Sequence, residues 1–310
     1  MSDWPADDHA RALDVFRGTL AALESPAWQA LSDAAARVEV SRARAFFEHW
    51  FEPTLIGDPS DALITGYFEP ELRASRIRTT RYPVPLYAPP AELSASDRWA
   101  SRAEIEDQNL LAGRGLEIAW VESELDRFFL QVQGSGRLRF AEGGDLRLGY
   151  DGKNGHPYRS VGKELVRRGV VPESEITADD IRRVYTADPE AGRRLLQHNP
   201  SFVFFRVLPN LSPDEGPLGT LGHPVTAGRT LAVDPEFIPL GAPVWVETDG
   251  ARPMRRLLVA QDTGSAITGP QRADVFIGTG DAAGGIAGAM RDPGRIITLL
   301  PKGAPARVPL

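Results

Sequence analysis

Residues 257–277 read LLVAQDTGSAITGPQRADVFI, two short apolar runs on either side of a loop rich in glycine and small polar residues. The runs Leu257–Gln261 and Val275–Ile277 have the length and composition of buried β-strands, and the Gly and Pro residues between them are typical of a turn. Similar runs beyond Pro200 predict further strands at Phe202–Val207, Thr230–Val233, Val244–Glu247 and Ile296–Leu300. A closed barrel would pair these strands and leave no exposed edge.

Upstream of these strands the pattern changes twice. Between His9 and Trp50 apolar residues recur at helical spacing, with a break at Ser25–Pro26, which predicts N-terminal helices. After Pro53 short β-type runs appear, and two helical runs follow them. The predicted strands are Leu63–Phe68, Tyr82–Tyr87, Leu116–Val121 and Arg127–Gln133, and the predicted helices are Ser160–Arg168, closed by Gly169, and Asp179–Leu196.

These runs predict a mainly β protein with an α+β insertion. Residues 1–69 and 208–310 would form the N-terminal helices and the barrel, and residues 70–207 would form a second domain. Domain junctions are favoured places for ligand sites, so we expect a groove between the two domains.

The composition is that of a globular protein and excludes several kinds of site. The 310 residues are 42% hydrophobic and 25% charged with a net charge of -7, so the basic surface of a nucleic-acid-binding protein is not expected. The absence of cysteine excludes disulfides, thiolate nucleophiles and cysteine-based zinc sites. The start MSDWPADDHA has neither the basic nor the apolar region of a signal peptide, and no segment approaches the roughly 18 apolar residues of a membrane span. We therefore expect no signal peptide, lipid-anchor cysteine or transmembrane segment in this chain.

Three aspartates at the ends of predicted strands are the strongest candidates for chemistry: Asp234, Asp262 and Asp274. They stand beside Gly and Thr residues that let a ligand approach the backbone, and a carboxyl group with a raised pKa can act as a general acid. Aspartates at strand ends also cap turns, and spacing alone does not separate the two roles.

Several blocks, in order along the chain, resemble a known family. They are Thr65–Phe68 with Pro70, Tyr82–Tyr87, Ser101–Ile105, Val132–Gly136, Gly152–Lys163, Asn199–Phe205 and the segments around the three aspartates. Extending from Leu63 to Leu300, they are similar to the membrane-bound lytic murein transglycosylases of the A type. Gly264–Ser265 departs from the Gly-Gly that is common there. The resemblance implies a double-psi β-barrel related to the three-aspartate domain.

In that family the aspartate matching Asp274 is the catalytic acid/base. Asp262 and Asp234 match the other two aspartates and are interpreted as supporting residues that tune Asp274 through hydrogen bonds and charge, with Asp262 as the second candidate for the acid. The resemblance implies that Asp274 protonates the β-1,4 glycosidic oxygen between N-acetylmuramic acid and N-acetylglucosamine. It then accepts the proton of the muramoyl C6 hydroxyl, which gives a 1,6-anhydromuramoyl product without a cofactor.

Residues with small or amphipathic side chains are the candidates for glycan contacts. They are Thr65, Gly66 and Tyr67 on one side of the expected groove and Gln133, Gly134, Ser135, Gly136, Lys153, Asn154 and Tyr158 on the other. For each of these residues a turn or a place in the core is an equally good explanation.

Two other functions remain open. A non-catalytic glycan-binding module would use the same groove without a protonated carboxyl group. A hydrolytic glycosidase would need a second carboxylate across the cut bond, and Glu69 and Glu104 are the candidates for it.

The remaining motifs predict no further chemistry. The five histidines show no HExxH pattern or ligand spacing, so no metal site is expected. Gly278–Gly284 lacks the βαβ context of a dinucleotide loop and predicts a turn into a short helix. The resemblance implies that the partner is the glycan strand of peptidoglycan and that the location is the periplasm or the outer membrane.

Overall fold

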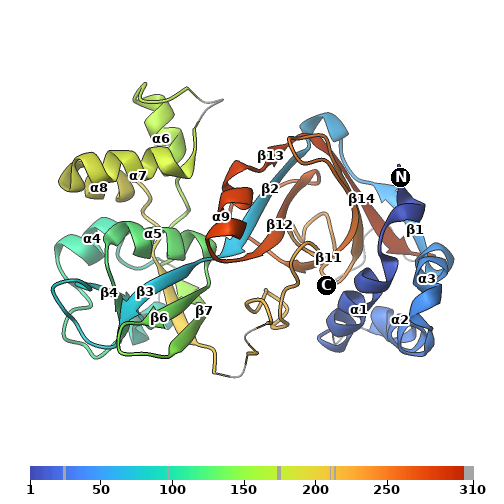
Figure 1. The fold of residues 1–310 in the computed structure, drawn as a ribbon, viewed down its shortest axis with the longest axis horizontal. Helices are drawn as coiled ribbons and strands as arrows, with labels where there is room; N and C mark the ends of the chain where they lie inside the picture. Colours follow the sequence, from blue (N-terminus) through green and yellow to red (C-terminus); the bar gives the residue numbers. More distant parts are fainter. Residues whose placement is uncertain (24–25, 96–97, 173–175, 210, 213, 304–310) are drawn as a thin grey trace. The chain divides into compact units, whose positions relative to one another are not determined.

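The chain divides into two units, each with its own sheet (Figure 1). The structure is a computed structural model that describes residues 1–23, 26–95, 98–172, 176–209, 211–212 and 214–303. Residues 1–68 and 213–310 form one unit, here called the barrel unit, and residues 69–212 form the other, here called the insert unit. The chain therefore leaves the barrel unit once and returns to it once.

The sheet of the barrel unit has eight strands in the order β1-β14-β10-β11-β9-β12-β2-β13. They are β1 Phe51–Leu55, β2 Leu63–Glu69, β9 Thr230–Val233, β10 Pro243–Thr248, β11 Met254–Asp262, β12 Arg272–Thr279, β13 Arg291–Asp292 and β14 Gly294–Pro301. β11 runs parallel to β9, whereas β12 pairs with β9 in the antiparallel direction. β2 precedes the insert in the chain, yet it lies in this sheet between β12 and β13, which follow the insert.

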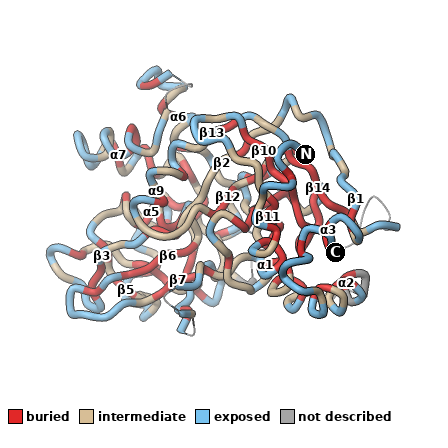
Figure 2. Tube along the Cα trace, turned by 45° about the vertical axis from the view of Figure 1, so that its right-hand side comes forward, coloured by how far each residue is buried: buried red, intermediate tan, exposed pale blue. Residues whose placement is uncertain are grey.

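The central strands of this sheet are covered on both faces. β9 and β10 are buried at every position, and buried residues also predominate along β11 and β14 (Figure 2). Their sequences carry continuous apolar runs rather than an alternation of apolar and polar residues, which is the pattern of strands with two covered faces. The strands predicted in these regions are confirmed.

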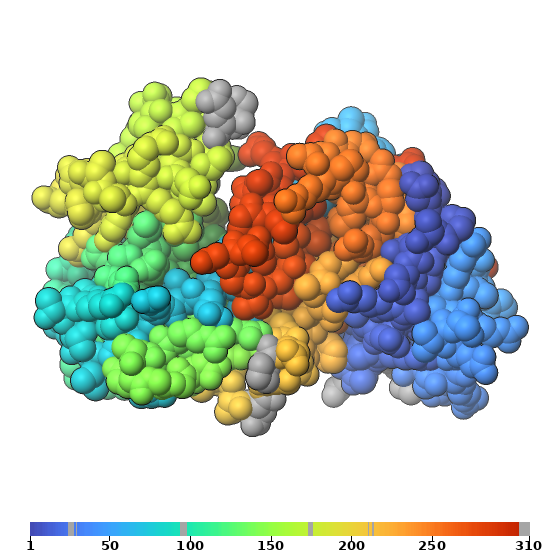
Figure 3. All heavy atoms as spheres, viewed as in Figure 1, coloured from blue at the N-terminus to red at the C-terminus, as the bar shows by residue number. Residues whose placement is uncertain are grey.

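Helices from the N-terminal part of the chain pack on the barrel unit. They are α1 His9–Ala21, α2 Pro26–Arg37 and α3 Ala43–Trp50, with the short helices η1 Trp4–Ala6, η2 Val40–Arg42 and η3 Pro59–Asp61. The predicted break includes Ser25, which lies outside the described residues. Phe16 packs against Phe47 and Phe51, and all three belong to the same core cluster as the barrel strands. Figure 3 shows these helices, in blue, on the outside of the barrel unit.

The insert unit contains a six-stranded sheet in the order β4-β5-β3-β6-β7-β8. The strands are β3 Glu71–Ser75, β4 Val84–Tyr87, β5 Glu117–Val121, β6 Gly136–Phe140, β7 Asp145–Lys153 and β8 Val203–Val207. The outer strands β4 and β8 contact each other, so this sheet is nearly closed.

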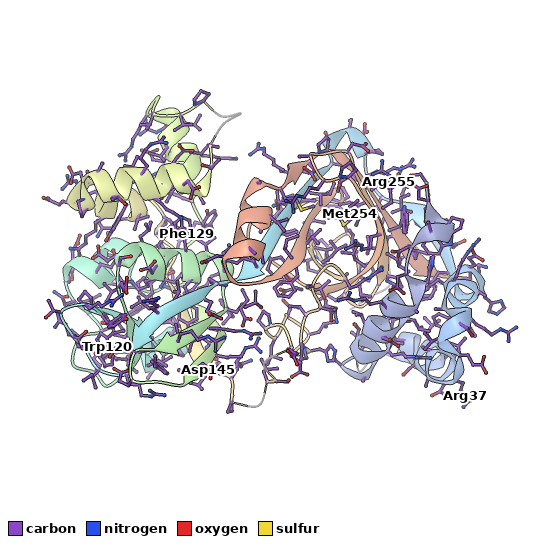
Figure 4. The ribbon with its side chains drawn as sticks, in the orientation of Figure 1. Arg37, Trp120, Phe129, Asp145, Met254 and Arg255 are labelled. Carbon is purple, nitrogen blue, oxygen red and sulfur yellow. The ribbon has the colours of Figure 1, made fainter. Side chains whose placement is uncertain are left out.

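The insert unit also contains helices, several of which share a core of their own. They are η4 Ala91–Ala95, α4 Arg102–Asp107, α5 Glu124–Gln133, α6 Val161–Arg167, α7 Ala178–Ala187 and α8 Pro189–Leu196. Phe128 of α5, Leu165 of α6, Ile181 of α7 and Leu195 of α8 share one cluster, against which Phe129 packs (Figure 4). The prediction of a mainly β protein with a barrel and an inserted α+β unit is confirmed. None of the described helices is both long and apolar enough to span a bilayer.

The prediction of a strand at Arg127–Gln133 is wrong, because these residues belong to α5. The Ser123 side chain accepts a hydrogen bond from the backbone N–H of Asp126 and starts a helix there. Leu125 and Phe128, three positions apart, then face the same cluster. Gly134 ends the helix with a φ of 77°.

The single helix predicted at Asp179–Leu196 is two helices, α7 and α8. Asp188 has extended backbone, and its side chain accepts hydrogen bonds from the N–H groups of Glu190 and Ala191. Pro189 follows at the first position of α8, where its missing N–H costs no helical hydrogen bond. Asp188 is therefore an N-cap in the middle of the apolar pattern, and it divides the predicted helix into two.

Glu69, the first residue of the insert unit, is fully buried between two arginines. Arg137 Nε donates to its Oε2 at 2.8 Å, and Arg147 Nη2 donates to its Oε1 at 2.8 Å. The two arginines are directly opposite on β6 and β7, where like charges alone would repel. Arg147 Nη1 also donates to the carbonyl of Ser212 at 3.0 Å, so one guanidinium binds both ends of the insert unit.

We expect Glu69→Gln to lower the free energy of unfolding by about 3–5 kcal/mol, because two largely buried guanidinium groups lose their shared carboxylate. Urea and thermal unfolding of the whole chain measure the loss. Glu71→Gln is the matched control, since Glu71 pairs with Arg139 at 2.9 Å on the surface and its loss should cost under about 1 kcal/mol. Equally small losses in both variants would show that the Glu69 ion pairs add little to stability.

Candidate active site

Asp274 lies on β12 between the buried residues Ala273 and Val275. Successive side chains of a strand point to opposite faces, so the Asp274 carboxyl group points away from the core that its neighbours join. In the sheet, β2 lies beside β12 and brings Thr65 to Asp274. Thr65 Oγ1 donates a hydrogen bond to Asp274 Oδ1 at 2.5 Å.

Asp262, the last residue of β11, has hydrogen-bond donors on both carboxylate oxygens. Its Oδ1 accepts from the backbone N–H and the hydroxyl of Thr220, both at 2.9 Å, and from the backbone N–H of Thr263 at 2.9 Å. Its Oδ2 accepts from the Tyr67 hydroxyl at 3.0 Å. Tyr67 follows Thr65 by two positions on β2, so one strand presents a donor to each of the two aspartates.

The two carboxyl groups lie in different environments, although burial raises the pKa of both. The four hydrogen bonds to Asp262 stabilise its carboxylate and oppose this rise. Asp274 receives one hydrogen bond, from Thr65. The positive charge of Arg272 lowers its pKa as well, and the negative charge of Asp262 raises it. Asp262 is therefore the better stabilised anion, and Asp274 is the better placed of the two to hold a proton.

Tyr67 is a persistent donor in this network. Burial raises the pKa of its phenol well above the usual value, and the nearby charges of Asp262 and Asp274 add to the rise. The ring also packs against Phe276, with 5.2 Å between the ring centroids. Tyr67 therefore remains protonated at neutral pH and keeps its hydrogen bond to Asp262.

Asp234 organises the backbone that leads into β12. Its Oδ1 accepts from the N–H of Glu236 at 3.1 Å, and its Oδ2 accepts from the N–H of Gly269 at 2.7 Å. The second bond ties down the loop that connects β11 to β12. The side chain thus has the turn-capping role that strand-end aspartates often take.

Gly66 has a packing role that needs no ligand. A Cβ atom at this position would lie 2.9 Å from the Cα of Ala287 and 3.1 Å from the side chain of Ile277. Ala287 belongs to α9, Gly280–Ala289, the short helix that the glycine-rich segment predicted. The glycine therefore lets α9 approach β2 closely.

The predicted glycan contacts at residues 133–136 lie where α5 passes into β6. Gln133 is the last residue of α5, Gly134 is its C-cap, and Ser135 is buried. A Cβ atom on Gly136 would lie 2.3 Å from the side chain of Leu130 and 3.1 Å from the carbonyl of Pro70. Packing within the insert unit therefore accounts for Gly136.

Asn154 is a structural residue of the insert unit. It is fully buried, and its side-chain amide donates to the carbonyls of Ala100 at 2.8 Å and Pro200 at 2.9 Å. Its Oδ1 accepts from the N–H of Phe202 at 2.8 Å. These hydrogen bonds to the backbone account for Asn154 without a glycan. Lys153 and Tyr158, by contrast, are only half-buried.

Thr220 and Thr263 belong to the site and were not predicted. Thr263 follows Asp262 directly in the chain, so its place beside this aspartate could have indicated its role. Thr220 precedes Asp262 by 42 residues and lies in a segment without a strand pattern. Only the folded chain brings its hydroxyl and N–H to the carboxylate.

Neither glutamate considered for a hydrolytic mechanism is available as a second catalytic carboxylate. Glu69 is fully buried and bound by two arginines. Glu104 forms the capping box of α4 by accepting from the N–H and hydroxyl of Ser101 at 2.8 and 2.7 Å. Within the described parts of the chain, no three His, Asp or Glu side chains are grouped to hold a metal ion.

Two family models match the chain. The MltA specific insert domain matches residues 63–206, and the 3D domain matches residues 229–300. Membrane-bound lytic murein transglycosylase A of Vibrio cholerae is 35% identical over 262 residues, which cover 80% of this chain and 68% of the relative. The protein of that name from Escherichia coli K12 is 36% identical over 245 residues, covering 76% of this chain and 64% of the relative. The alignments thus span about two thirds of the length of these curated relatives.

Solved structures share the fold along nearly the whole chain. A membrane-bound lytic murein transglycosylase from Agrobacterium tumefaciens has a TM-score of 0.88 and 32% identity, with 97% of this chain and 95% of that chain covered. Escherichia coli MltA with bound chitohexaose has a TM-score of 0.76 and 30% identity, with 98% and 91% covered. With both domain models, two curated relatives and these structures in agreement, the chain belongs to the family of membrane-bound lytic murein transglycosylases A.

Proposed function

We propose that this chain cleaves peptidoglycan at the β-1,4 bond between N-acetylmuramic acid and N-acetylglucosamine, as a lytic transglycosylase with Asp274 as its only acid/base. The observation that carries the proposal is the carboxyl group of Asp274, whose pKa burial raises, held by one donor beside the fully hydrogen-bonded Asp262. Family membership supports the reaction class. The chitohexaose bound by the Escherichia coli relative supports a β-1,4-linked amino-sugar strand as the ligand.

In the first step Asp274 acts as the general acid. Thr65 binds Oδ1, and no other described residue donates to this carboxyl group, so Oδ2 is the oxygen that can face the substrate. The protonated carboxyl group gives its proton to the glycosidic oxygen as the C1–O bond of the muramoyl sugar breaks. Burial favours the protonated form that this step requires.

In the second step the Asp274 carboxylate acts as the base. It accepts the proton of the muramoyl C6 hydroxyl while that oxygen forms a bond to C1 of the same ring, and the product is a 1,6-anhydro sugar. The nucleophile belongs to the substrate and is held at high effective molarity, so no second carboxylate has to activate a water molecule.

Asp262 has an electrostatic role in this scheme. Its negative charge raises the pKa of Asp274 before the reaction, and it also opposes the positive charge that develops at C1 as the leaving group departs. The hydrogen bonds from Tyr67 and Thr220 keep Asp262 ionised and fixed in position. Asp234 acts through the backbone by holding the loop before β12.

The insert unit is proposed as a substrate-binding unit. Lys153 and Tyr158 are the candidates retained there, together with the helix-end residues Gln133, Gly134 and Ser135, whereas Asn154 and Gly136 are explained by packing. Peptidoglycan lies in the periplasm, and the named relatives are membrane-bound, so the proposed location is the periplasm at the outer membrane.

We expect Asp274→Asn to abolish release of 1,6-anhydromuropeptides from purified peptidoglycan, with a rate loss of at least about a thousandfold, because the amide can neither give nor take the proton. Mass spectrometry detects these products as one water lighter than hydrolytic products. Reducing-end products from the unaltered chain would indicate a hydrolase, and binding without any product would indicate a glycan-binding module.

The stability of Asp274→Asn can also be predicted. Burial raises the pKa of Asp274, so its stabilising contribution is present below the unfolded pKa of about 3.9 and is lost as pH rises through the folded pKa. Asp274→Asn should therefore unfold at or above the temperature of the unaltered chain at pH 7. If the variant instead unfolded at a lower temperature than the unaltered chain, loss of folding could explain its loss of activity.

The pH dependence of kcat/KM should move in opposite directions in two variants. The alkaline limb reports loss of the proton from the general acid. Thr65→Val removes a hydrogen bond that lowers the pKa of Asp274, so the limb should shift to higher pH. Asp262→Asn removes a charge that raises this pKa, so the limb should shift to lower pH. Shifts in the same direction, or none, would exclude Asp274 as the titrating acid.

A further inference from the structure

Two arginines stand on the face of the barrel sheet that carries Asp274. Arg272 precedes Asp274 by two positions on β12, so both side chains leave the same face of the strand. Arg291 of β13 lies directly opposite Thr65 of β2. Directly opposed residues of an antiparallel pair share a face, with Cβ atoms about 4.5–5.5 Å apart. The backbone of Arg291 therefore lies beside Thr65, the residue that binds the Asp274 carboxyl group.

The two guanidinium groups are held differently. Arg272 is half-buried, and its Nη1 donates to the carbonyls of Ala273 at 2.5 Å and Leu63 at 3.3 Å. Burial lowers its pKa, the Asp274 charge opposes this effect, and the Arg291 charge adds to it. The charges of Asp274 and Arg291 therefore both act on Arg272.

Arg291 is exposed, and across the residues that the structure covers no acceptor binds its guanidinium. Some exposed arginines are paired with carboxylates, such as Arg139 with Glu71 at 2.9 Å and Arg295 with Glu247 at 2.5 Å, and Arg291 is not among them. What distinguishes Arg291 is its position, because it lies opposite Thr65, the residue that binds the candidate acid. Its fork of N–H groups suits a carboxylate from outside the chain.

The proposed substrate offers such a group on one of its two sugars. N-acetylglucosamine has no ionisable group, whereas N-acetylmuramic acid carries a lactyl ether that ends in a carboxyl group. In intact strands this carboxyl group is bonded to a peptide stem, which has carboxylates of its own. Either source places a negative charge on the muramoyl sugar, the sugar whose C1 and C6 react.

We propose that Arg291, with Arg272 beside it, determines specificity by binding a carboxylate carried by the muramoyl sugar at the cut bond. This inference rests on the proposed function. Arg272 is tied to the backbone and contributes its positive charge, while Arg291 is free to reach the ligand. Arg291 thereby distinguishes peptidoglycan from an uncharged β-1,4-linked amino-sugar strand.

The test is a binding comparison in the Asp274→Asn background, in which strands are bound without being cut. The probes are chitohexaose, strands stripped by an amidase to expose lactyl carboxylates, and strands that keep their stems. Adding Arg291→Gln should weaken binding of a carboxylate-bearing strand about fivefold to tenfold, reduce its salt dependence and leave chitohexaose binding unchanged. A loss on stripped strands identifies the lactyl carboxylate, and a loss only on stem-bearing strands identifies the stem.

Two further variants serve as controls. Arg252→Gln removes an exposed arginine from the turn between β10 and β11. Arg252 is not on β2, β12 or β13, so this change should alter none of the affinities. Arg291→Lys keeps the charge and should restore part of the affinity. Equal losses on all three probes, or no loss on either charged strand, would overturn the inference. Release of 1,6-anhydro products by the unaltered chain is measured in parallel, so failure of the proposed function is detected separately.

Discussion

The hydrogen bond from Thr65 to Asp274 joins residues that are 209 positions apart, and the architecture of the barrel unit is what makes it possible. It requires β2 to lie beside β12, although the whole insert unit separates these strands in the chain. β2 then supplies Thr65 to one aspartate and Tyr67 to the other, and it presents Gly66 to α9 on its opposite face. The position of one strand therefore sets the hydrogen bonding, the spacing and much of the electrostatics of the site.

Two neighbouring aspartates acquire different chemistry because they have different donors. Asp262 is surrounded by hydroxyl and backbone N–H groups that favour its ionised form. Asp274 has one hydroxyl donor, and the opposite charges of Arg272 and Asp262 act on it. Such an arrangement suits a reaction that needs one proton donor and one fixed negative charge. A nucleophile supplied by the substrate removes the need for a second catalytic carboxylate, which agrees with the structural roles of Glu69 and Glu104.

The insert unit is held together by polar contacts of another kind. The Glu69 carboxylate lies between Arg137 and Arg147, and Arg147 also binds the Ser212 carbonyl, so the two ends of the unit are linked through one side chain. Asn154 similarly joins the segments around Ala100, Pro200 and Phe202. Buried polar groups that are fully hydrogen-bonded can specify one arrangement of irregular chain, which apolar packing alone specifies poorly.

The amino-acid sequence by itself determined the barrel strands, since runs such as Thr230–Val233 are apolar at every position and bounded by turn residues. It also singled out Asp262 and Asp274, because each stands at the end of a predicted strand in a block that resembles the three-aspartate segments of the family. It misplaced Arg127–Gln133, where aromatic and β-branched residues suggested a strand while the capping Ser123 and the spacing of Leu125 and Phe128 favoured a helix. Only the tertiary structure decided that Asn154 is buried, that Thr220 reaches Asp262 and that Arg291 stands opposite Thr65. These facts depend on strand pairing and chain packing between distant segments, for which a local sequence pattern carries no information.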